Sequence, residues 1–401
     1  MVLLPYYTAL ISEVGCGDLD YLQMQNRISA ESGGIGVSFS VEGQVDNVNN
    51  LSGYMIFNGK ALTRNRAALT ELLGDVLSDA RFDEHERIRE LVAKIRARRE
   101  QAVTANGHGL AMNAASQGIS PGAWLAFRLD GLEAIRRSKS LDRSLDDPAE
   151  LSAFCDRLAS MHNRVRKQQR QFLLIAEDEQ LQPMLEEIRQ FWGTEPERSA
   201  EAWELAQKPY QIRQAWLTTT QVNFCSKAFP TVAVDHPDAA ALSVLGGFLR
   251  NGYLHRAIRE KGGAYGGGAG QDSVNGTFRF FSYRDPRLSE TLDDFDQSLK
   301  WLENENHDAQ DAEESILGVI SQLDKPESPA GAASRAFHNH LFGRTPAQRS
   351  RFRERVLSVT IDDMKRVARV WLTPENASTA VITSYESREL AEKLGLELHE
   401  V

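Results

Sequence analysis

The sequence predicts an α+β fold made of two homologous domains, each an antiparallel sheet backed by helices. A chain of 401 residues is too long for one ordinary hydrophobic core. Its short apolar strands are few and its long helical patterns are many, with Gly or Pro between them. A succession of helix, glycine turn, strand and helix also occurs twice, shifted by 229 residues. We therefore expect a duplication, with domains at 1–207 and 208–401.

The first copy begins with an apolar stretch, MVLLPYYTALISEVG, which predicts a strand starting almost at residue 1. Such an abrupt start indicates a fragment of a longer protein. The basic stretch RIRELVAKIRARRE predicts an amphipathic helix with a solvated face. The other predicted elements are a helix at 19–34, a glycine turn at 33–37, a strand at 51–57, a helix at 65–77, further long helices, and a closing strand at 171–175 with a terminal helix.

The second copy follows a polar stretch, Gly193–Pro209, in which we place the domain boundary. Its predicted elements are a strand from about Arg213, a helix at 248–263, a glycine turn at 262–266, a strand at 276–282, a helix at 288–302, further helices, and a closing strand at 380–383 with a terminal helix.

Composition excludes several classes of protein. The net charge of -10 and the pI near 5.5 argue against binding to nucleic acid or to an acidic membrane surface. No apolar run reaches the roughly 18 residues of a membrane span, and the N-terminus lacks the features of a signal peptide. The three cysteines, Cys16, Cys155 and Cys225, are too far apart for a disulfide framework. We expect the cytoplasm or another reducing compartment.

No self-sufficient catalytic motif is present. None of the nine histidines lies in H-E-x-x-H or H-x-x-E-H, the patterns that place two zinc ligands on one helix face. In RFDEH the first ligand position is Arg81, which cannot bind a metal. His338 and His340 are two residues apart, so on a helix they point to different faces. We expect no metal site in this chain.

The segment REKGGAYGGGAG, residues 259–270, is the strongest candidate site. Gly262 and Gly263 would let the chain leave a helix with positive φ. Further glycines in a strand cost roughly 0.5–1 kcal/mol each relative to Ala, which is easier to explain where a ligand or another backbone lies close.

Arg259 and Tyr265 flank this glycine turn, and each has a structural alternative. Arg259 would sit in the last turn of a helix, where a cation is favoured by the helix dipole. Tyr265 would be an inward-facing core residue. In the first copy the equivalent positions are Ala30 and Gly36, so the glycine turn belongs to the fold and the Arg/Tyr pair to one copy only.

This segment resembles the Arg/Tyr segment in the C-terminal half of pitrilysin-like peptidases, the inverted zincins. The form Gly-Gly-Ala-Tyr-Gly is most similar to the presequence-protease branch. DYLQMQNRISAESGGIGVS resembles the start of the third domain of that branch, and SPAGAASRAFHNHLFGRTPAQRSRFRERVLSVT its late fourth-domain helices. The resemblance covers residues 3–384.

The resemblance implies four α+β domains in two bowl-shaped halves, which enclose a chamber for unstructured peptides. Zinc and the catalytic glutamate would belong to an H-x-x-E-H motif in the N-terminal half or in a partner subunit. Arg259 and Tyr265 would then be catalytic residues contributed from this chain. The neighbouring strand edge would bind substrate through Gly262, Gly263, Ala264, Gly266 and Gly267.

Two alternatives stay open. The chain is a separate non-catalytic subunit that pairs with a metal-bearing partner, or it is a scaffold that has lost peptidase activity. Retention of both Arg259 and Tyr265 argues against the scaffold, because a scaffold needs neither.

Overall fold

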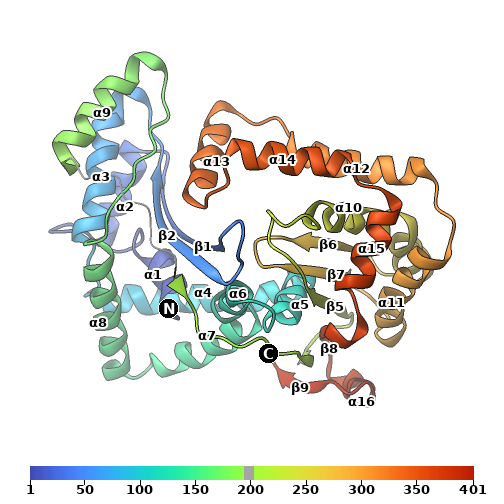
Figure 1. The fold of residues 1–401 in the computed structure, drawn as a ribbon. Helices are drawn as coiled ribbons and strands as arrows, with labels where there is room; N and C mark the ends of the chain where they lie inside the picture. Colours follow the sequence, from blue (N-terminus) through green and yellow to red (C-terminus); the bar gives the residue numbers. More distant parts are fainter. Residues whose placement is uncertain (194–202) are drawn as a thin grey trace.

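The structure, a computed structural model, describes residues 1–193 and 203–401 as two halves lying side by side (Figure 1). The elements of the first half are α1 (Leu4–Leu10), α2 (Tyr21–Glu31), β1 (Ile35–Gly43), β2 (Asn50–Gly59), α3 (Arg66–Asp79), α4 (His85–Ala105), α5 (Gly107–Ser116), α6 (Pro121–Asp130), α7 (Leu132–Ser144), α8 (Pro148–Val165), α9 (Asp178–Trp192) and β3 (Trp203–Glu204).

The second half continues the α+β pattern. Its elements are β4 (Arg213–Thr218), β5 (Phe224–Pro230), α10 (Ala239–Leu249), the π-helix η2 (Arg250–Lys261), β6 (Gly266–Asp272), β7 (Thr277–Tyr283), α11 (Ser289–Asn304), α12 (Ala309–Leu323), α13 (Pro329–Leu341), α14 (Pro346–Leu357), α15 (Ile361–Trp371), β8 (Ser378–Ser384), α16 (Arg388–Lys393) and β9 (Glu397–Glu400).

The repeated succession of elements is present in both halves. Helix α2, the hairpin β1–β2 and helix α3 correspond in order to η2, the hairpin β6–β7 and α11. The second glycine of each turn has a positive φ, 105° at Gly34 and 78° at Gly263. This left-handed conformation favours glycine because it has no Cβ to clash with the backbone. The shared glycine turn is therefore a requirement of the fold.

Two predicted strands are wrong. Residues near the N-terminus form helix α1, which begins at Leu4 and buries Tyr6, Tyr7 and Leu10 on one face. That spacing is helical, and the aromatic residues had suggested a strand. Residues 171–175 form no strand, and Phe172 and Leu173 are exposed. A strand needs a partner edge, which its own sequence does not supply.

The sheet of the second half is mixed. Its strand order is β6-β7-β5-β8-β4-β9. Strand β4 runs parallel to both β8 and β9, whereas β5, β6 and β7 pair antiparallel. In the first half β1, β2 and β3 pair antiparallel. The predicted α+β class is confirmed, with parallel pairs at one end of the second sheet.

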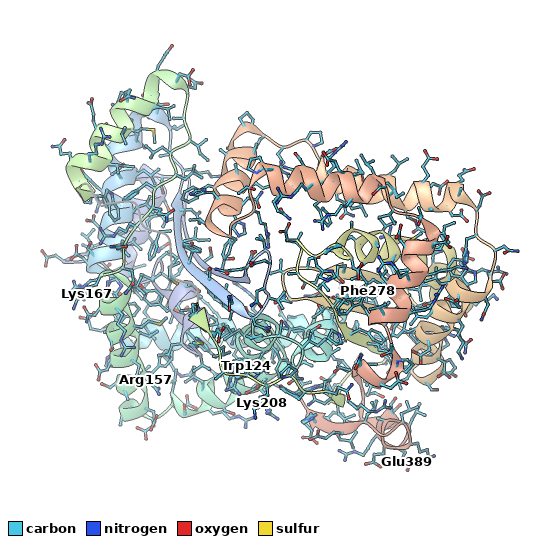
Figure 2. All side chains as sticks on the ribbon, viewed as in Figure 1. Trp124, Arg157, Lys167, Lys208, Phe278 and Glu389 are labelled. Carbon is cyan, nitrogen blue, oxygen red and sulfur yellow. The ribbon has the colours of Figure 1, made fainter. Side chains whose placement is uncertain are left out.

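The six-stranded sheet is covered on both faces. One face packs against α10, η2 and α11 of its own half, around Phe248, Phe278 and Phe295, and α14 and α15 pack in turn against α10. Phe278, labelled in Figure 2, is fully buried in this half, whereas the labelled Arg157 and Lys167 of the first half and Glu389 of the second are exposed. The first half has a separate core formed mainly by α1, α2, α3, α4 and α8.

The other face of that sheet packs against the first half. Leu110, Ala111 and Ala114 of α5 lie in one buried cluster with Trp216 and Phe224 of the second half. The two halves therefore share a hydrophobic core. The domain boundary between 207 and 208 stays a prediction, and part of the polar stretch around it, residues 194–202, lies outside the described residues.

A second set of contacts joins the β1–β2 hairpin to α13 and the loop that follows it. Glu42 of β1 accepts a hydrogen bond from Arg344 at 2.5 Å and lies 3.3 Å from Nε2 of His338. The Tyr54 hydroxyl donates to the carbonyl of Leu341 at 2.9 Å. His338 thus contributes to the contacts between the halves.

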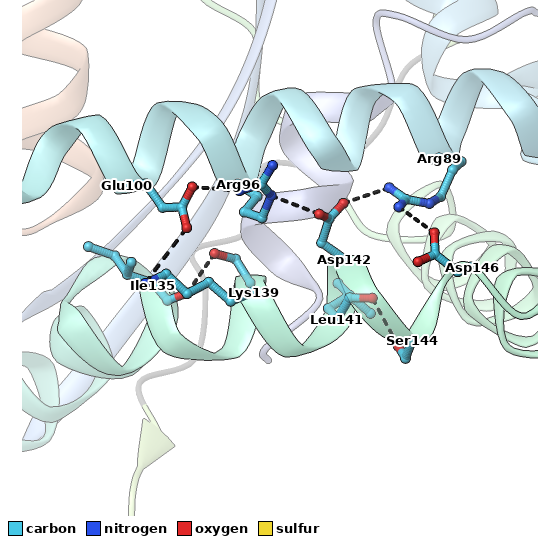
Figure 3. Close-up of polar contacts among 10 residues, drawn as sticks. Arg89, Arg96, Glu100, Ile135, Lys139, Leu141, Asp142, Ser144 and Asp146 are labelled. Atoms are coloured by element: carbon cyan, nitrogen blue, oxygen red, sulfur yellow. Dashed lines mark hydrogen bonds and ion pairs between the residues drawn. The ribbon is translucent and has the colours of Figure 1, made fainter. Parts of the chain in front are cut away.

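The basic helix α4 is amphipathic as predicted, but its arginines are not simply solvated. The Asp142 carboxylate of α7 accepts a hydrogen bond from Arg89 at 2.6 Å and lies 2.7 Å from Nε of Arg96 (Figure 3). Glu100 pairs in turn with Arg96 and Lys139. The network links α4 to α7, so these arginines hold together the helices that carry the shared core.

Asp142→Asn should destabilise the protein by about 2–3 kcal/mol, because it leaves two partly buried arginines without their common anion. Asp146→Asn is the matched control, since Asp146 also pairs with Arg89 but its side chain is 73% exposed; it should cost at most about 0.5 kcal/mol. Urea unfolding of both variants measures this difference. Equal midpoints would show that the Asp142 network contributes nothing to stability.

Candidate functional site

The candidate site lies where helix η2 passes into the edge strand β6. Strand β6 pairs with β7 on one side, and no other described strand pairs with it. The amide of Gly263 donates to the carbonyl of Arg259 at 3.1 Å, and that of Ala264 donates to Ile258 at 3.1 Å. These bonds close the helix and turn the chain directly into the strand.

Glycine is required at the two positions of the turn for different structural reasons. Gly263 needs its positive φ of 78°, as predicted. Gly262 has a φ of -82°, so the prediction of positive φ is wrong there. A Cβ at Gly262 would instead overlap the guanidinium of Arg287 and lie 2.5 Å from the Ile258 carbonyl oxygen. Arg287 donates to the Ala257 carbonyl and to Asp294, and so fastens the end of η2 to α11.

Tyr265 is 67% exposed, which excludes the alternative that it is a core residue. Its ring stands edge-on to Tyr283, with 5.5 Å between centroids and an angle of 90°. The guanidinium carbon of Arg259 lies 5.9 Å from the centre of the Tyr265 ring, within reach of a cation–π contact. The structure therefore brings the two predicted catalytic residues together on the surface.

The polar groups of this pair are free of other protein partners in the described parts of the chain. Within residues 1–193 and 203–401, the Tyr265 hydroxyl has no hydrogen-bond partner, and the Arg259 guanidinium has neither an ion pair nor a hydrogen bond. Arg259 lies in the last turn of η2, where its charge also favours the helix dipole. A phenol donor and a cation side by side suit a peptide carbonyl oxygen that gains negative charge.

The remaining glycines of β6 divide into two groups. A Cβ at Gly267 would lie 2.9 Å from Ile258, and one at Gly268 would lie 3.2 Å from Arg250, so these two glycines admit helix η2. A Cβ at Gly266 or Gly270 would meet nothing within 4 Å. Ala264 is buried and belongs to the core of the second half. Substrate contacts at these positions stay a prediction, and for Ala264 only its backbone is suited to one.

Sequence reasoning missed the residues that support Tyr265 from β7 and the turn after it. The Tyr265 amide donates to the carbonyls of Tyr283 at 3.1 Å and Arg284 at 3.4 Å. Arg284 has a φ of 49°, rare for a residue with a side chain. Asp285 is buried and accepts from Arg287 and Thr291, and burial raises the pKa of its carboxyl. The Asp-Pro pair after β7 was the available signal of a turn.

The described residues do not fit a zinc site. In these parts of the chain, no three His, Cys, Asp or Glu side chains are grouped so that they could hold a metal ion. All three cysteines are buried thiols, and burial raises the pKa of Cys16 to about 12 and that of Cys155 to about 11. No helix among the described residues is long and apolar enough to cross a membrane.

Two families match this chain. Residues 1–141 match the family described as "Peptidase M16C associated", and residues 213–384 match the "PreP C-terminal domain". The mitochondrial presequence protease of Danio rerio is 28% identical over 92% of this chain and 38% of its own length. That of Yarrowia lipolytica is 28% identical over 96% of this chain and 39% of its own length. The chain thus spans about two fifths of these relatives.

Solved structures share the fold. A peptidase M16 inactive domain from Pseudomonas fluorescens has a TM-score of 0.60 at 14% identity, covering 94% of this chain and 87% of that one. The ferredoxin protease FusC, solved as a point mutant in complex with Arabidopsis ferredoxin, also has a TM-score of 0.60 at 14% identity, over 95% of this chain and 40% of that one.

The expected cytoplasmic location is wrong by this comparison, because the relatives that match are mitochondrial presequence proteases. The wide spacing of the three cysteines had suggested a reducing environment, but unpaired thiols do not distinguish among compartments that keep thiols reduced. Family matches to both halves, similarity along nearly the whole length and a shared fold agree. The chain belongs to the pitrilysin-like peptidase family and corresponds to the C-terminal half of such a peptidase.

Proposed function

We propose that this chain is the non-metal-binding half of a zinc-dependent endopeptidase that degrades unstructured oligopeptides in an enclosed chamber. The observation that carries the proposal is the exposed Tyr265 side chain, with the Arg259 guanidinium over its ring, at the start of an edge strand of the described chain. Membership of a peptidase family supports it. Zinc would be held by the N-terminal half or a partner subunit, because the described residues offer no fitting ligand set.

Tyr265 would donate a hydrogen bond to the carbonyl oxygen of the bond being cleaved. Arg259, whose charge no carboxylate in the described residues neutralises, would add positive potential at the same oxygen. Such preorganised donors act most strongly where charge develops in the transition state and water is excluded. Closure of the metal-bearing half over this surface would provide that exclusion.

The free edge of β6 would hold the substrate backbone. An extended peptide pairs with an exposed strand edge through main-chain hydrogen bonds, which need no particular side chains. Open space beside Gly266 and Gly270 leaves room for the side chains of that peptide. This arrangement suits unstructured peptides of varied sequence.

Tyr265→Phe in the complete peptidase should lower kcat/KM by about 30- to 1000-fold, since loss of one transition-state donor costs about 2–4 kcal/mol. Tyr385→Phe is the matched control, because Tyr385 is 48% exposed and lies after β8, outside the site; it should have no effect. Steady-state hydrolysis of a quenched peptide measures both. Wild-type kcat/KM for Tyr265→Phe would contradict the assignment of this residue.

Arg259→Gln should also lower kcat/KM while the melting temperature stays unchanged, because Gln keeps much of the stem and a polar end but removes the charge. Arg369→Gln controls for loss of an exposed arginine, since its side chain is 64% exposed and pairs with Glu303. A fall in kcat/KM of Arg259→Gln that is accompanied by a fall in its melting temperature would indicate a structural role for Arg259.

The isolated chain should hold no stoichiometric zinc and hydrolyse no peptide, and adding the metal-bearing half should restore hydrolysis. Metal analysis after dialysis and the same peptide assay test this. One tightly bound zinc per isolated chain, with hydrolysis sensitive to EDTA, would refute the division of labour between the halves.

A further inference from the structure

A residue of the first half touches the aromatic group behind Tyr265. His108, at the start of α5, lies 4.8 Å from the ring centre of Tyr283, edge-on at 64°. It also lies 5.8 Å from the ring of Phe281. Both aromatic residues belong to β7, so the first half reaches across the shared core to the strand that supports the site.

A glycine makes this approach feasible. A Cβ at Gly107 would lie 2.5 Å from the ring of Phe224, so only a glycine lets the first turn of α5 lie this close to the sheet. Phe224 is fully buried and its ring centre lies 5.9 Å from that of Tyr283. Tyr283 is thus packed between Phe224 and His108.

Tyr283 in turn contacts Tyr265 in two ways. Its carbonyl accepts the Tyr265 amide at 3.1 Å, and its ring meets the Tyr265 ring edge-on at 5.5 Å. In the described residues, the other contact of the Tyr265 ring with an aromatic or cationic group is Arg259. The Tyr283 ring therefore supports the side chain of Tyr265, which is otherwise exposed.

His108 acts in this group as a packed ring. Its Nδ1 is buried and, in the described parts of the chain, accepts or donates no hydrogen bond. Burial lowers the pKa of its imidazole, which favours the neutral ring. The contact with Tyr283 accounts for the position of this side chain better than any polar partner does.

We propose that His108 is a positioning residue for Tyr265 and acts through Tyr283. The inference rests on the proposed function, because the orientation of Tyr265 matters to catalysis only if its hydroxyl meets the substrate. A donor works when it is held within about 0.5 Å of its productive position by neighbours whose own side chains are locked. The first half of this chain would thereby control the position of a side chain that belongs to its second half.

The test is a double-mutant cycle in the complete peptidase, with His108→Ala, Tyr265→Phe and the double variant. His108→Ala should lower kcat by about 10- to 100-fold, since a displacement of about 1 Å can cost up to about 100-fold, while KM changes little. In the Tyr265→Phe background the same substitution should have no further effect, because the hydroxyl that it positions is gone. His108→Phe should restore most of kcat, since a flat ring again supports Tyr283.

His307→Ala is the matched control, because His307 packs edge-on to Trp301 at 4.5 Å on the helical side of the second half; its kcat should equal that of the wild type. Should His108→Ala lower the melting temperature, His108→Leu replaces it in the cycle, filling the volume without a ring. The inference about His108 would be overturned, without affecting the proposed function, by either of two results. One is a wild-type kcat for His108→Ala or His108→Leu, and the other is a loss of kcat from that substitution that is as large in the Tyr265→Phe background as in the wild type. Wild-type activity of Tyr265→Phe would overturn both proposals.

Discussion

The packing of α5 on the six-stranded sheet is the constraint on which the rest of the molecule depends. Leu110, Ala111 and Ala114 cover a sheet face that carries Trp216 and Phe224. Without this helix, that face would expose a large apolar surface to water. Burial of the face holds the two halves together, and the hydrogen bonds of Glu42 and Tyr54 to the helical layer then fix their orientation.

Close approach of neighbouring side chains or backbone explains several of the glycines near the site. On one side, Gly246 meets Gly270 so closely that a Cβ would lie 2.7 Å from its Cα, and Gly267 admits Ile258. On the other, Gly107 admits Phe224. The edge strand is thus closely packed against helices of its own half, while no described strand pairs with its outer edge. A closely packed strand with such an edge, beside the hydroxyl of Tyr265 and the guanidinium of Arg259, is what a substrate-binding surface requires.

Local sequence patterns predicted those parts of the fold that depend on local chemistry. The predicted glycine turn is present, with a positive φ at Gly263. The predicted strand begins at Arg213, and Arg259 lies at the end of a helix as expected. The segment itself singled out Arg259 and Tyr265, and the family resemblance added their catalytic role, which remains a prediction.

The features that the sequence did not predict depend on distant contacts. Residues 171–175 have the composition of a strand but form none, because pairing depends on a partner edge. The parallel placement of β4 between β8 and β9 depends on segments at the far end of the chain. His108 is one ordinary histidine in the sequence, and only the fold brings it to Tyr283. Periodicity and turn chemistry carry no information about such pairs.

The central claim is that this chain supplies substrate-binding groups to a catalytic centre located on the metal-bearing half of the peptidase. A structure of the complete peptidase, made inactive at its catalytic glutamate and bound to an uncleaved peptide, tests it most directly. The account predicts the Tyr265 hydroxyl about 3 Å from the carbonyl oxygen of the bond to be cleaved, with Arg259 facing the same oxygen and the peptide paired along β6. A bound peptide that passes the metal without approaching Tyr265 or β6 would contradict it.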